Sequence, residues 1–388
     1  MPIYLDNAAT SFPKPESVYQ AMDQSHRTHA VAAGRGNYLR AHSANHLVES
    51  TRDALAKLIN ANDRKEISFA FSGTDALSTA ILGFVNQGDH VITTAADHTS
   101  VLRPLWHLDQ LGKIELSIVD CDAKGFVSPA DIAQQIRPTT KLVCITHASN
   151  VTGAIQPIQE IAATCQQNSV RLLVDAAQTI GHCPIDVQAM GCDFLAAPGH
   201  KGLFGPQGTG FLYASHEVAE QTSPLRFGGT GSSGTEFKQP TETPKKFESG
   251  NINIASIAGL AAGIKWLESQ AGAGLLKQLS ENSRRLLTGL NSIPSFKLYG
   301  VPDPVTACIS FNLEGLDCHA AGMLLESEFE IECRTGLHCA PLIHPFLGSE
   351  SYGGTIRFSP GPFNTAAEID IAIESISKMS LQIQRTVK

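Results

Sequence analysis

The stretch 170–178, Val-Arg-Leu-Leu-Val-Asp-Ala-Ala-Gln, decides the fold of this chain. Its apolar residues predict a buried strand over 170–174, which ends in the carboxylate of Asp175. Open α/β sheets bind their ligands at the carboxyl edge of such strands. A buried aspartate needs a cationic partner, so we expect one near Asp175. The alternative is an aspartate that only caps the strand-to-helix turn.

Short β-branched strands alternate with helical stretches on both sides of this segment. The predicted strands are 67–71, 90–94, 115–119, 141–146, 170–174 and 210–213, and the predicted helices are 74–85, 100–111, 128–136 and 157–167. This alternation predicts an α/β fold with a mostly parallel sheet between helices. Residues 142–145, Leu-Val-Cys-Ile, are apolar on both faces, as a sheet covered on both sides requires.

The last third of the chain has a different pattern. A segment rich in Gly, Ser, Thr and Pro at 227–242 predicts a long functional loop. A helix at 257–270 and short strands at 296–299, 308–312 and 355–358 then predict a smaller α+β domain. We place the boundary near residue 258, which gives a large domain of residues 16–258 and a small domain of residues 1–15 and 259–388.

Composition excludes several classes of function. The 388 residues include 29 Lys and Arg against 37 Asp and Glu, a formal net charge of −8, and no run of like charge that would suit nucleic acid. Neither a membrane span nor a signal peptide is recognisable, so we expect a cytoplasmic protein with no membrane partner. Nine cysteines without a C-x-x-C pair predict mostly free thiols.

One lysine stands in unusual surroundings. In the stretch 197–210, Ala-Pro-Gly-His-Lys-Gly-Leu-Phe-Gly-Pro-Gln-Gly-Thr-Gly, Lys201 is the sole charged side chain beside a protonatable His200. An ammonium that is poorly solvated there has a lowered pKa, which frees the neutral amine for a Schiff base. The alternative is an exposed loop lysine. The segment matches neither the phosphate-binding loop motif G-x-x-x-x-G-K-[ST] nor the dinucleotide-binding motif G-x-G-x-x-G.

Four motifs taken together resemble those of a known family. They are D-x-x-Q at 175–178, G-H-K-x-x-x-G-P-x-G at 199–208, R-T-G-x-H-C-A at 334–340 and R-x-S at 357–359. The combination resembles the class V, fold-type I enzymes of pyridoxal phosphate (PLP), and within them the cysteine desulfurases. The resemblance runs from 5–10 to 363–365, essentially the whole chain. It implies a fold-type I PLP-dependent transferase with PLP as its cofactor.

The resemblance implies a role for each motif residue around the cofactor ring. Lys201 is similar to the Schiff-base lysine, and Asp175 to the carboxylate that keeps the pyridine nitrogen protonated. The second role agrees with the general need of PLP for an acidic partner. Gln178 resembles the donor to the phenolic oxygen of the ring. His98 resembles the imidazole that stacks on the ring, although a histidine before a helix is also a common cap.

The phosphate ligands implied in the same way are Gly73, Thr74 and His200. A hydroxyl and backbone N–H groups at a helix N-terminus suit a phosphate, and Thr74 also fits a simple N-cap. Two residues depart from the family pattern. Pro198 stands where a Ser or Thr is frequent, and Asn251 stands where a threonine of the partner subunit is expected. Either Asn251 or Thr230 is therefore expected to complete the phosphate site across a dimer.

Asn150 and Arg357 resemble the pair that binds the substrate carboxylate. A guanidinium binds a carboxylate through two parallel hydrogen bonds. Without the motif, a salt bridge to a nearby acidic residue is the first interpretation of Arg357.

Cys339 resembles the nucleophilic thiol of the family. Arg334 and His338 are placed to favour its thiolate form. An alternative set of metal ligands, Cys333, His338, Cys339 and His344, fits neither of the usual zinc spacings, so we predict no metal.

These features predict a PLP-dependent cysteine desulfurase. L-cysteine or L-selenocysteine gives L-alanine, Lys201 moves the α-proton, and His98 supplies protons. A persulfide on Cys339 then passes to an acceptor protein or a small thiol. The resemblance also implies a homodimer in which the Gly-rich loop of one subunit completes the site of the other.

Two alternatives remain at this point. One is a carbon–sulfur lyase, an aminotransferase or an epimerase of the same fold, none of which needs the Cys339 thiol. The other is a metal-binding or scaffolding protein without catalysis. The presence of Lys201 and Asp175 argues against this second alternative.

Overall fold

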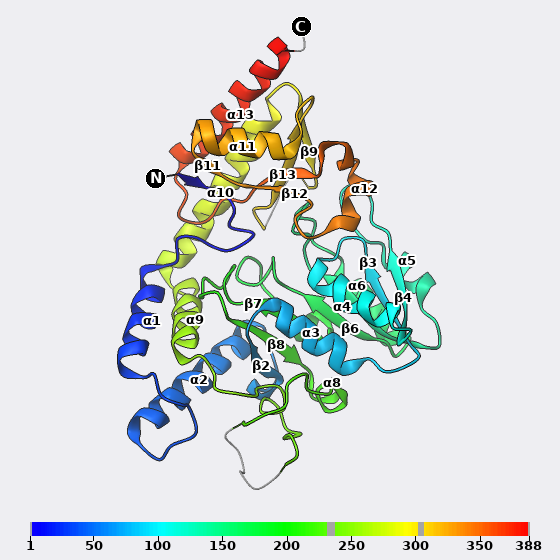
Figure 1. Ribbon diagram of the computed structural model, residues 1–388, viewed down its shortest axis with the longest axis vertical. Coiled ribbons are helices and arrows are strands. Elements are labelled where there is room, and N and C mark those ends of the chain that lie inside the picture. Colours follow the sequence, from blue (N-terminus) through cyan, green and yellow to red (C-terminus); the bar gives the residue numbers. More distant parts are fainter. Residues whose placement is uncertain (1, 231–236, 302–305, 387–388) are drawn as a thin grey trace.

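The computed structural model of the protein describes residues 2–230, 237–301 and 306–386. Its largest sheet has seven strands, seen in the lower half of Figure 1. In spatial order these are β2 (Ile67–Ala70), β8 (Gly210–Ala214), β7 (Phe194–Pro198), β6 (Arg171–Asp175), β5 (Thr140–Thr146), β3 (Asp89–Thr94) and β4 (Ile114–Val119). Neighbours pair in parallel except β8, which runs antiparallel to β2 and β7. The prediction of a mostly parallel sheet is confirmed.

Strand β7 has no counterpart among the predicted strands. Its sequence, Phe-Leu-Ala-Ala-Pro, contains two alanines and a proline, which are poor strand formers. All five residues are buried between β6 and β8, with Phe194 opposite Leu173 of β6. The strand forms because both neighbours supply pairing partners, which short-range sequence patterns do not reveal.

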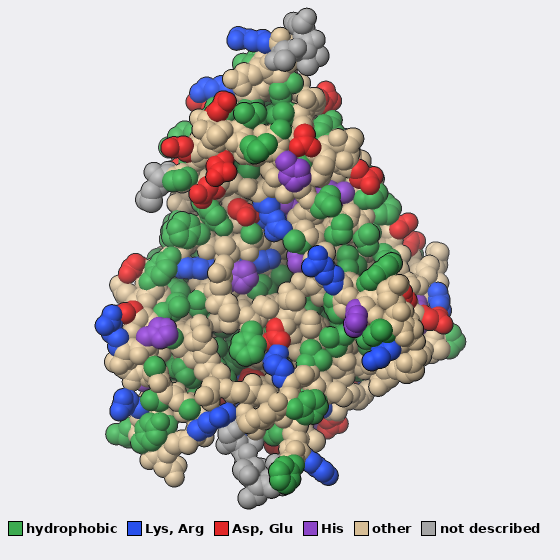
Figure 2. Space-filling view, in the orientation of Figure 1, with side chains coloured by type: hydrophobic (Ala, Val, Ile, Leu, Met, Phe, Trp, Pro, Cys, Tyr) green, Lys and Arg blue, Asp and Glu red, His purple; other side chains and the backbone are tan. Residues whose placement is uncertain are grey.

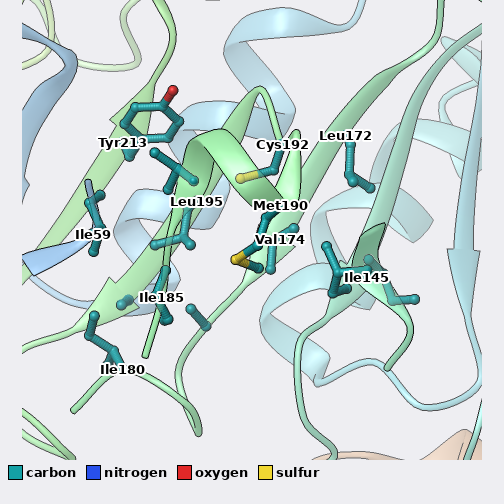
Figure 3. Close-up of a cluster of buried hydrophobic side chains, with 14 of the residues drawn as sticks. Ile59, Ile145, Leu172, Val174, Ile180, Ile185, Met190, Cys192, Leu195 and Tyr213 are labelled. Carbon is teal, nitrogen blue, oxygen red and sulfur yellow. The ribbon is translucent and has the colours of Figure 1, made fainter. Parts of the chain in front are cut away.

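Helices cover both faces of the large sheet (Figure 1). One face packs against α3 (Gly73–Phe84), α4 (Thr99–Gln110) and α8 (His216–Gln221), and the other against α2 (Leu39–Leu58), α6 (Ile158–Gln167), α7 (Val187–Met190) and α9 (Ile254–Leu267). Along β6, Leu172 and Val174 enter the cluster on the α6 side, drawn in Figure 3, and Leu173 enters the cluster on the α3 side. This alternation explains the continuous apolar run of the strand.

Two further helices belong to this part of the chain. Helix α1 (Glu16–Thr28) packs along α9, and α5 (Pro129–Gln135) contacts β4 and α6. The predicted boundary at residue 258 lies inside α9, so one continuous helix crosses it. The division into residues 16–258 and the remainder stays a prediction.

A second sheet lies at the other end of the molecule (Figure 1). It contains β12 (Arg334–Gly336), β13 (Thr355–Phe358), β10 (Ile309–Leu313) and β9 (Phe296–Tyr299), all antiparallel. A separate apolar cluster joins this sheet to α10 (Gln270–Asn291), α11 (Cys318–Phe329) and α13 (Ala366–Thr386). Near the start of the chain, β1 (Ile3–Tyr4) pairs in parallel with β11 (Ile331–Glu332). Helix α12 (His344–Leu347) follows β12.

Polar residues follow the carboxyl ends of the central strands. Asp175 ends β6, and Asn150 lies just beyond β5. Asp97, beyond β3, fixes two strand ends at once, because its carboxylate accepts from Thr94 N at 2.8 Å and from Thr146 N at 2.6 Å. These loops place chemically active side chains at one edge of the large sheet.

In the part of the chain that the structure describes, no helix is both long and apolar enough to traverse a bilayer.

Candidate functional site

A cavity of about 210 Å³ lies between the two sheets. Figure 2 shows Lys, Arg and His side chains gathered across the middle of one face of the molecule, at this level. Both sheets contribute to its wall, since Arg334 and Arg357 come from β12 and β13. The predicted site residues that line it are Gly73, Thr74, His98, Asn150, Asp175, Gln178, His200, Lys201 and Arg357. The structure thus gathers residues that are far apart in the sequence.

Lys201 and Asp175 form an interacting pair of charges in this cavity. Burial lowers the pKa of Lys201 to about 8, and the nearby Asp175 carboxylate opposes this shift. Asp175 is 4% exposed, and burial raises its pKa against the opposing effects of a hydrogen bond from Ala177 N and of Lys201. The predicted depression of the lysine pKa is confirmed, and Lys201 is the cation expected near Asp175.

The N-terminal segment closes one side of the cavity. The amide Nε2 of Gln178 donates to the carbonyl oxygen of Ala8 across 3.1 Å. His200 Nδ1 lies 3.0 Å from the hydroxyl oxygen of Thr10, and the Lys14 ammonium donates to the His200 carbonyl at 2.7 Å. The first strand and the loop after it therefore hold the backbone beside Lys201 in place.

The N-termini of α3 and α4 meet at the cavity, and the interpretation of Thr74 as a helix N-cap is wrong. The N-cap of α3 is Ser72, whose hydroxyl accepts from Asp75 N at 3.1 Å, so Thr74 does not cap the helix. His98 is the N-cap of α4, and its ring accepts from Ser100 N. His98 is therefore both a cap and a cavity residue, so the two interpretations of this histidine are compatible.

Arg357 and Asn150 are directly connected. Arg357 is fully buried, and its Nη1 donates to the Asn150 carbonyl at 3.0 Å. The Nη2 of Arg357 donates to Asp6 at 2.7 Å. This is the salt bridge to an acidic residue that was the first interpretation of Arg357 without the family motif. Among the described residues, no hydrogen-bond acceptor meets its Nε. This guanidinium keeps a free donor while it is desolvated, which suits an anionic ligand.

Cys339 lies on a tight loop beside the cavity. His338 and Cys339 both have positive φ, at 51° and 60°. The loop is held to α4 because the Cys339 carbonyl accepts from Thr99 N at 2.7 Å. The cavity wall does not include Cys339 itself, but its sulfur accepts from Arg334 Nη2 at 2.8 Å, and Arg334 is part of that wall. Cys339 is also one of the partly exposed thiols.

The expectation that His338 favours the thiolate form of Cys339 is wrong. The Nε2 of this buried ring lies 2.8 Å from the Thr355 hydroxyl, and its pKa is well below the usual range because of burial and of the Arg357 and Arg334 charges. A neutral histidine that is engaged elsewhere gives the sulfur no positive charge. Of the two predicted residues, Arg334 is the one that donates a hydrogen bond to the Cys339 sulfur.

The four residues of the alternative metal site are also placed by the structure. Within the described ranges, no group of three or more His, Cys, Asp or Glu side chains is arranged to hold a metal ion. The rings of His338 and His344 lie against Thr355 and Ser349 instead.

Asn251 lies apart from the cavity within this chain. It lines a different pocket, together with residues such as Phe71 and Arg226. Residues 231–236 of the predicted Gly-rich loop lie outside the described residues. The structure of one chain therefore does not bring Asn251 to the other predicted phosphate ligands.

Several site residues have no counterpart among the predictions. Ser72 begins the pattern Ser-x-x-Asp, which is a helix-start signal that the sequence did offer. Thr10 and Lys14 act through tertiary contacts with His200, and no short-range pattern marks them. Ser100 contacts His98 locally, but its contact with Thr74 joins two helices that are distant in the sequence.

Comparisons with known proteins place the chain in a family. Residues 3–371 match the model of the aminotransferase class-V family. A probable cysteine desulfurase of Methanothermobacter thermautotrophicus is 34% identical over 97% of this chain and 94% of its own length. A cysteine desulfurase of Yersinia pseudotuberculosis is 31% identical, with 97% and 93% covered.

Solved structures show the same similarity. The apo structure of a cysteine desulfurase from Thermococcus onnurineus NA1 superposes with a TM-score of 0.89 at 31% identity, and 98% of this chain and 95% of that one are covered. The cysteine desulfurase CsdA of Escherichia coli, in an S-sulfonic acid form, gives 0.84 at 28% identity, with 98% and 95% covered. The chain belongs to the aminotransferase class-V family and, within it, to the cysteine desulfurases.

Proposed function

We propose that the protein is a PLP-dependent cysteine desulfurase, which converts L-cysteine to L-alanine and keeps the sulfur as a persulfide on Cys339. The observation that carries this proposal is the position of Cys339, whose sulfur is held at 2.8 Å by Arg334 at the wall of the Lys201 cavity. Relatives and structural neighbours named cysteine desulfurase support it.

The residues present fit PLP, on which this family depends. Lys201 would hold the cofactor covalently, because its lowered pKa makes a neutral amine available near neutral pH. The buried Asp175 would pair with the pyridine nitrogen. His98 would stack on the ring, and Gln178 would donate to its phenolic oxygen. The hydroxyls and backbone N–H groups at the start of α3 supply donors of the kind a phosphate needs.

The remaining phosphate contacts are proposed in the same way. Gly73, Thr74 and His200 would hold the phosphate within one chain, and Thr230 or Asn251 of a partner subunit would complete it. The pocket that contains Asn251 is separate from the cavity, which is the arrangement expected if this residue serves a second copy of the chain. We therefore propose a homodimer.

Arg357 and Asn150 would hold the substrate. The Nε of the buried guanidinium has no acceptor among the described residues, and its Nη1 is oriented by the Asn150 carbonyl at 3.0 Å. The substrate carboxylate would compete with Asp6 for this guanidinium. Binding by these two residues fixes the α-carbon of the amino acid beside Lys201.

Each protein group then has one chemical task. PLP, when bound, supplies an electron sink for negative charge at the substrate α-carbon. The Lys201 amine removes the α-proton and returns a proton at the end of the cycle. The Cys339 thiolate attacks the substrate sulfur, so the S–S bond forms as the C–S bond breaks. The electron pair of that bond stays on the carbon fragment, which is protonated to alanine with help from His98.

An acceptor then removes the sulfur. A thiol of an acceptor protein or a small molecule attacks the outer sulfur of the persulfide and restores the Cys339 thiolate. L-Selenocysteine would follow the same path with selenium in place of sulfur. A cytoplasmic location stays a prediction.

The test follows the products of L-cysteine in the presence of a reductant. Wild type should release alanine and sulfide in equal amounts, and Cys339→Ala should release neither while it keeps the absorbance of bound PLP. Cys183→Ala is the matched control, since Cys183 is another partly exposed thiol outside the cavity, and it should behave as wild type. Pyruvate as the product, or activity in Cys339→Ala, would instead favour a lyase, an aminotransferase or an epimerase.

A further inference from the structure

Ser100 lies between two of the proposed cofactor ligands. Its backbone N–H donates to His98 Nδ1 across 3.0 Å, and its hydroxyl oxygen lies 2.9 Å from the same nitrogen. The same hydroxyl lies 2.8 Å from the hydroxyl of Thr74. Ser100 also lines the cavity. One side chain thus bridges the start of α3 and the start of α4.

These contacts determine the protonation state of the His98 ring. A backbone N–H can only donate, so Nδ1 must present a lone pair to Ser100. Burial and the nearby Lys201 and Arg334 charges lower the pKa of His98 to about 3, so the ring is neutral at physiological pH. A neutral imidazole carries one proton, which therefore lies on Nε2.

The Ser100 hydroxyl has one proton and two acceptors within reach, namely His98 Nδ1 and the Thr74 oxygen. Thr74 likewise has one proton to donate. The ionised oxygens of a phosphate can only accept, so Thr74 must donate its proton to one of them. The Thr74 oxygen is then left as an acceptor, and the Ser100 hydroxyl is the donor beside it.

We propose that Ser100 is a positioning residue that couples phosphate binding at Thr74 to the His98 ring. Phosphate binding turns the Ser100 hydroxyl from His98 Nδ1 to Thr74, and it leaves Nδ1 with the backbone N–H as its one donor from Ser100. The His98 ring keeps its Nε2–H form when the phosphate binds. The proposal rests on the proposed function in one respect, that a phosphate binds at Thr74.

The test uses ¹⁵N-histidine NMR on the full-length apoprotein, with inorganic phosphate as the probe and His98→Gln to assign the signal. Without phosphate, His98 should show an unprotonated Nδ1 and a protonated Nε2. Phosphate should move the Nδ1 resonance toward that of a free acceptor, because one donor is withdrawn. In Ser100→Ala the resonance should stay in place when phosphate is added.

The same titrations give phosphate affinity. Ser100→Ala should bind phosphate about threefold to tenfold more weakly, as expected for the loss of one hydrogen bond in a chain. Ser100→Thr keeps the hydroxyl and should restore both the affinity and the Nδ1 response. Ser128→Ala is the matched control, because Ser128 caps α5 outside the cavity, and it should behave as wild type.

Two results would overturn the proposal. One is a protonated Nδ1 in the wild-type apoprotein, and the other is a phosphate-dependent Nδ1 shift that persists in Ser100→Ala. Failure of the proposed desulfurase function would give a different result. In that case phosphate still moves the His98 Nδ1 resonance through Ser100, while L-cysteine yields no equal release of alanine and sulfide.

Discussion

The guanidinium of Arg334 donates to the sulfur of Cys339 across 2.8 Å. Hydrogen bonds to charged groups contribute about 1.5–3 kcal/mol, so Arg334 stabilises an anionic sulfur at this position. It also forms part of the cavity wall, which places the sulfur at the edge of the proposed substrate site. The reactivity of Cys339 should therefore depend on this one residue.

Arg334→Met removes both the charge and the donor while it keeps a long side chain. We expect this variant to react with iodoacetamide at Cys339 about tenfold more slowly at pH 7, and Arg334→Lys to lose less. Rates measured on the separate cysteine peptides by mass spectrometry test this. Cys183 is the internal reference, since burial raises its pKa to about 11. Equal rates at Cys339 in wild type and Arg334→Met would show that the contact does not activate the thiol.

The pKa of Lys201, at about 8, predicts how PLP binding depends on pH. Only the neutral amine attacks an aldehyde, and its share grows as the pH rises through the pKa. The rate of PLP association with the apoprotein should therefore rise with pH around 8. Asp175→Asn removes the negative charge that helps to hold the lysine proton, so the inflection should move to lower pH.

Stopped-flow absorbance measures these rates directly. Asp120→Asn, which neutralises an exposed carboxylate outside the cavity, should leave the inflection where it is. An inflection near the ordinary lysine value of about 10.4, or one that Asp175→Asn does not move, would contradict the assignment of Lys201 and Asp175 as an interacting pair.

Local chemistry marks two of the predicted site residues, and the other roles follow from the resemblance to the family. Asp175 stands at the end of an apolar strand, and Lys201 stands among glycines with no other fixed charge, so each is unusual within a few residues. The alternation of strands and helices predicted the large sheet for the same reason, because hydrophobic periodicity is a local property.

The rest depends on contacts between distant segments. Strand β7 forms because β6 and β8 flank it, and Ser100 matters because α3 begins beside it. His338 was expected to favour the thiolate of the adjacent Cys339. Both residues have positive φ, and the His338 ring lies against the Thr355 hydroxyl instead. Proximity in sequence did not translate into contact there.

Asp97 should be essential to the geometry of the strand ends. Its two oxygens accept from separate backbone donors, Thr94 N at 2.8 Å and Thr146 N at 2.6 Å. In Asp97→Asn the amide NH₂ must face one of these N–H groups, so one buried donor loses its acceptor. We expect a loss of about 1–3 kcal/mol in the free energy of unfolding.

Chemical denaturation of the two proteins measures this loss. Asp131→Asn on α5 is the control, because Asp131 is exposed, and its effect should stay within about 0.5 kcal/mol. If Asp97→Asn were as mild as the control, the carboxylate would not be what joins β3 to β5.

Arg52 and Glu248 form a buried ion pair outside the cavity. Arg52 is 1% exposed, and its Nη1 and Nη2 lie 2.7 and 3.0 Å from the two Glu248 oxygens. Glu248 also accepts from Phe69 N at 2.6 Å, so the pair ties the segment before Asn251 to β2. Arg52→Met would leave a desolvated carboxylate without a cation. We expect a loss of about 3–5 kcal/mol in the free energy of unfolding.

A double-mutant cycle separates the pair from its individual side chains. Once Arg52 is replaced, Glu248→Gln removes the unpaired charge while its amide oxygen still accepts from Phe69 N. The double variant should therefore lose clearly less stability than the sum of the two single losses. Arg285→Met is the matched control, since its partner Asp370 is exposed and water replaces the lost contact at little cost. Additive losses in the cycle would mean that Arg52 and Glu248 stabilise the sheet independently, and that their mutual attraction does not hold the Asn251 segment.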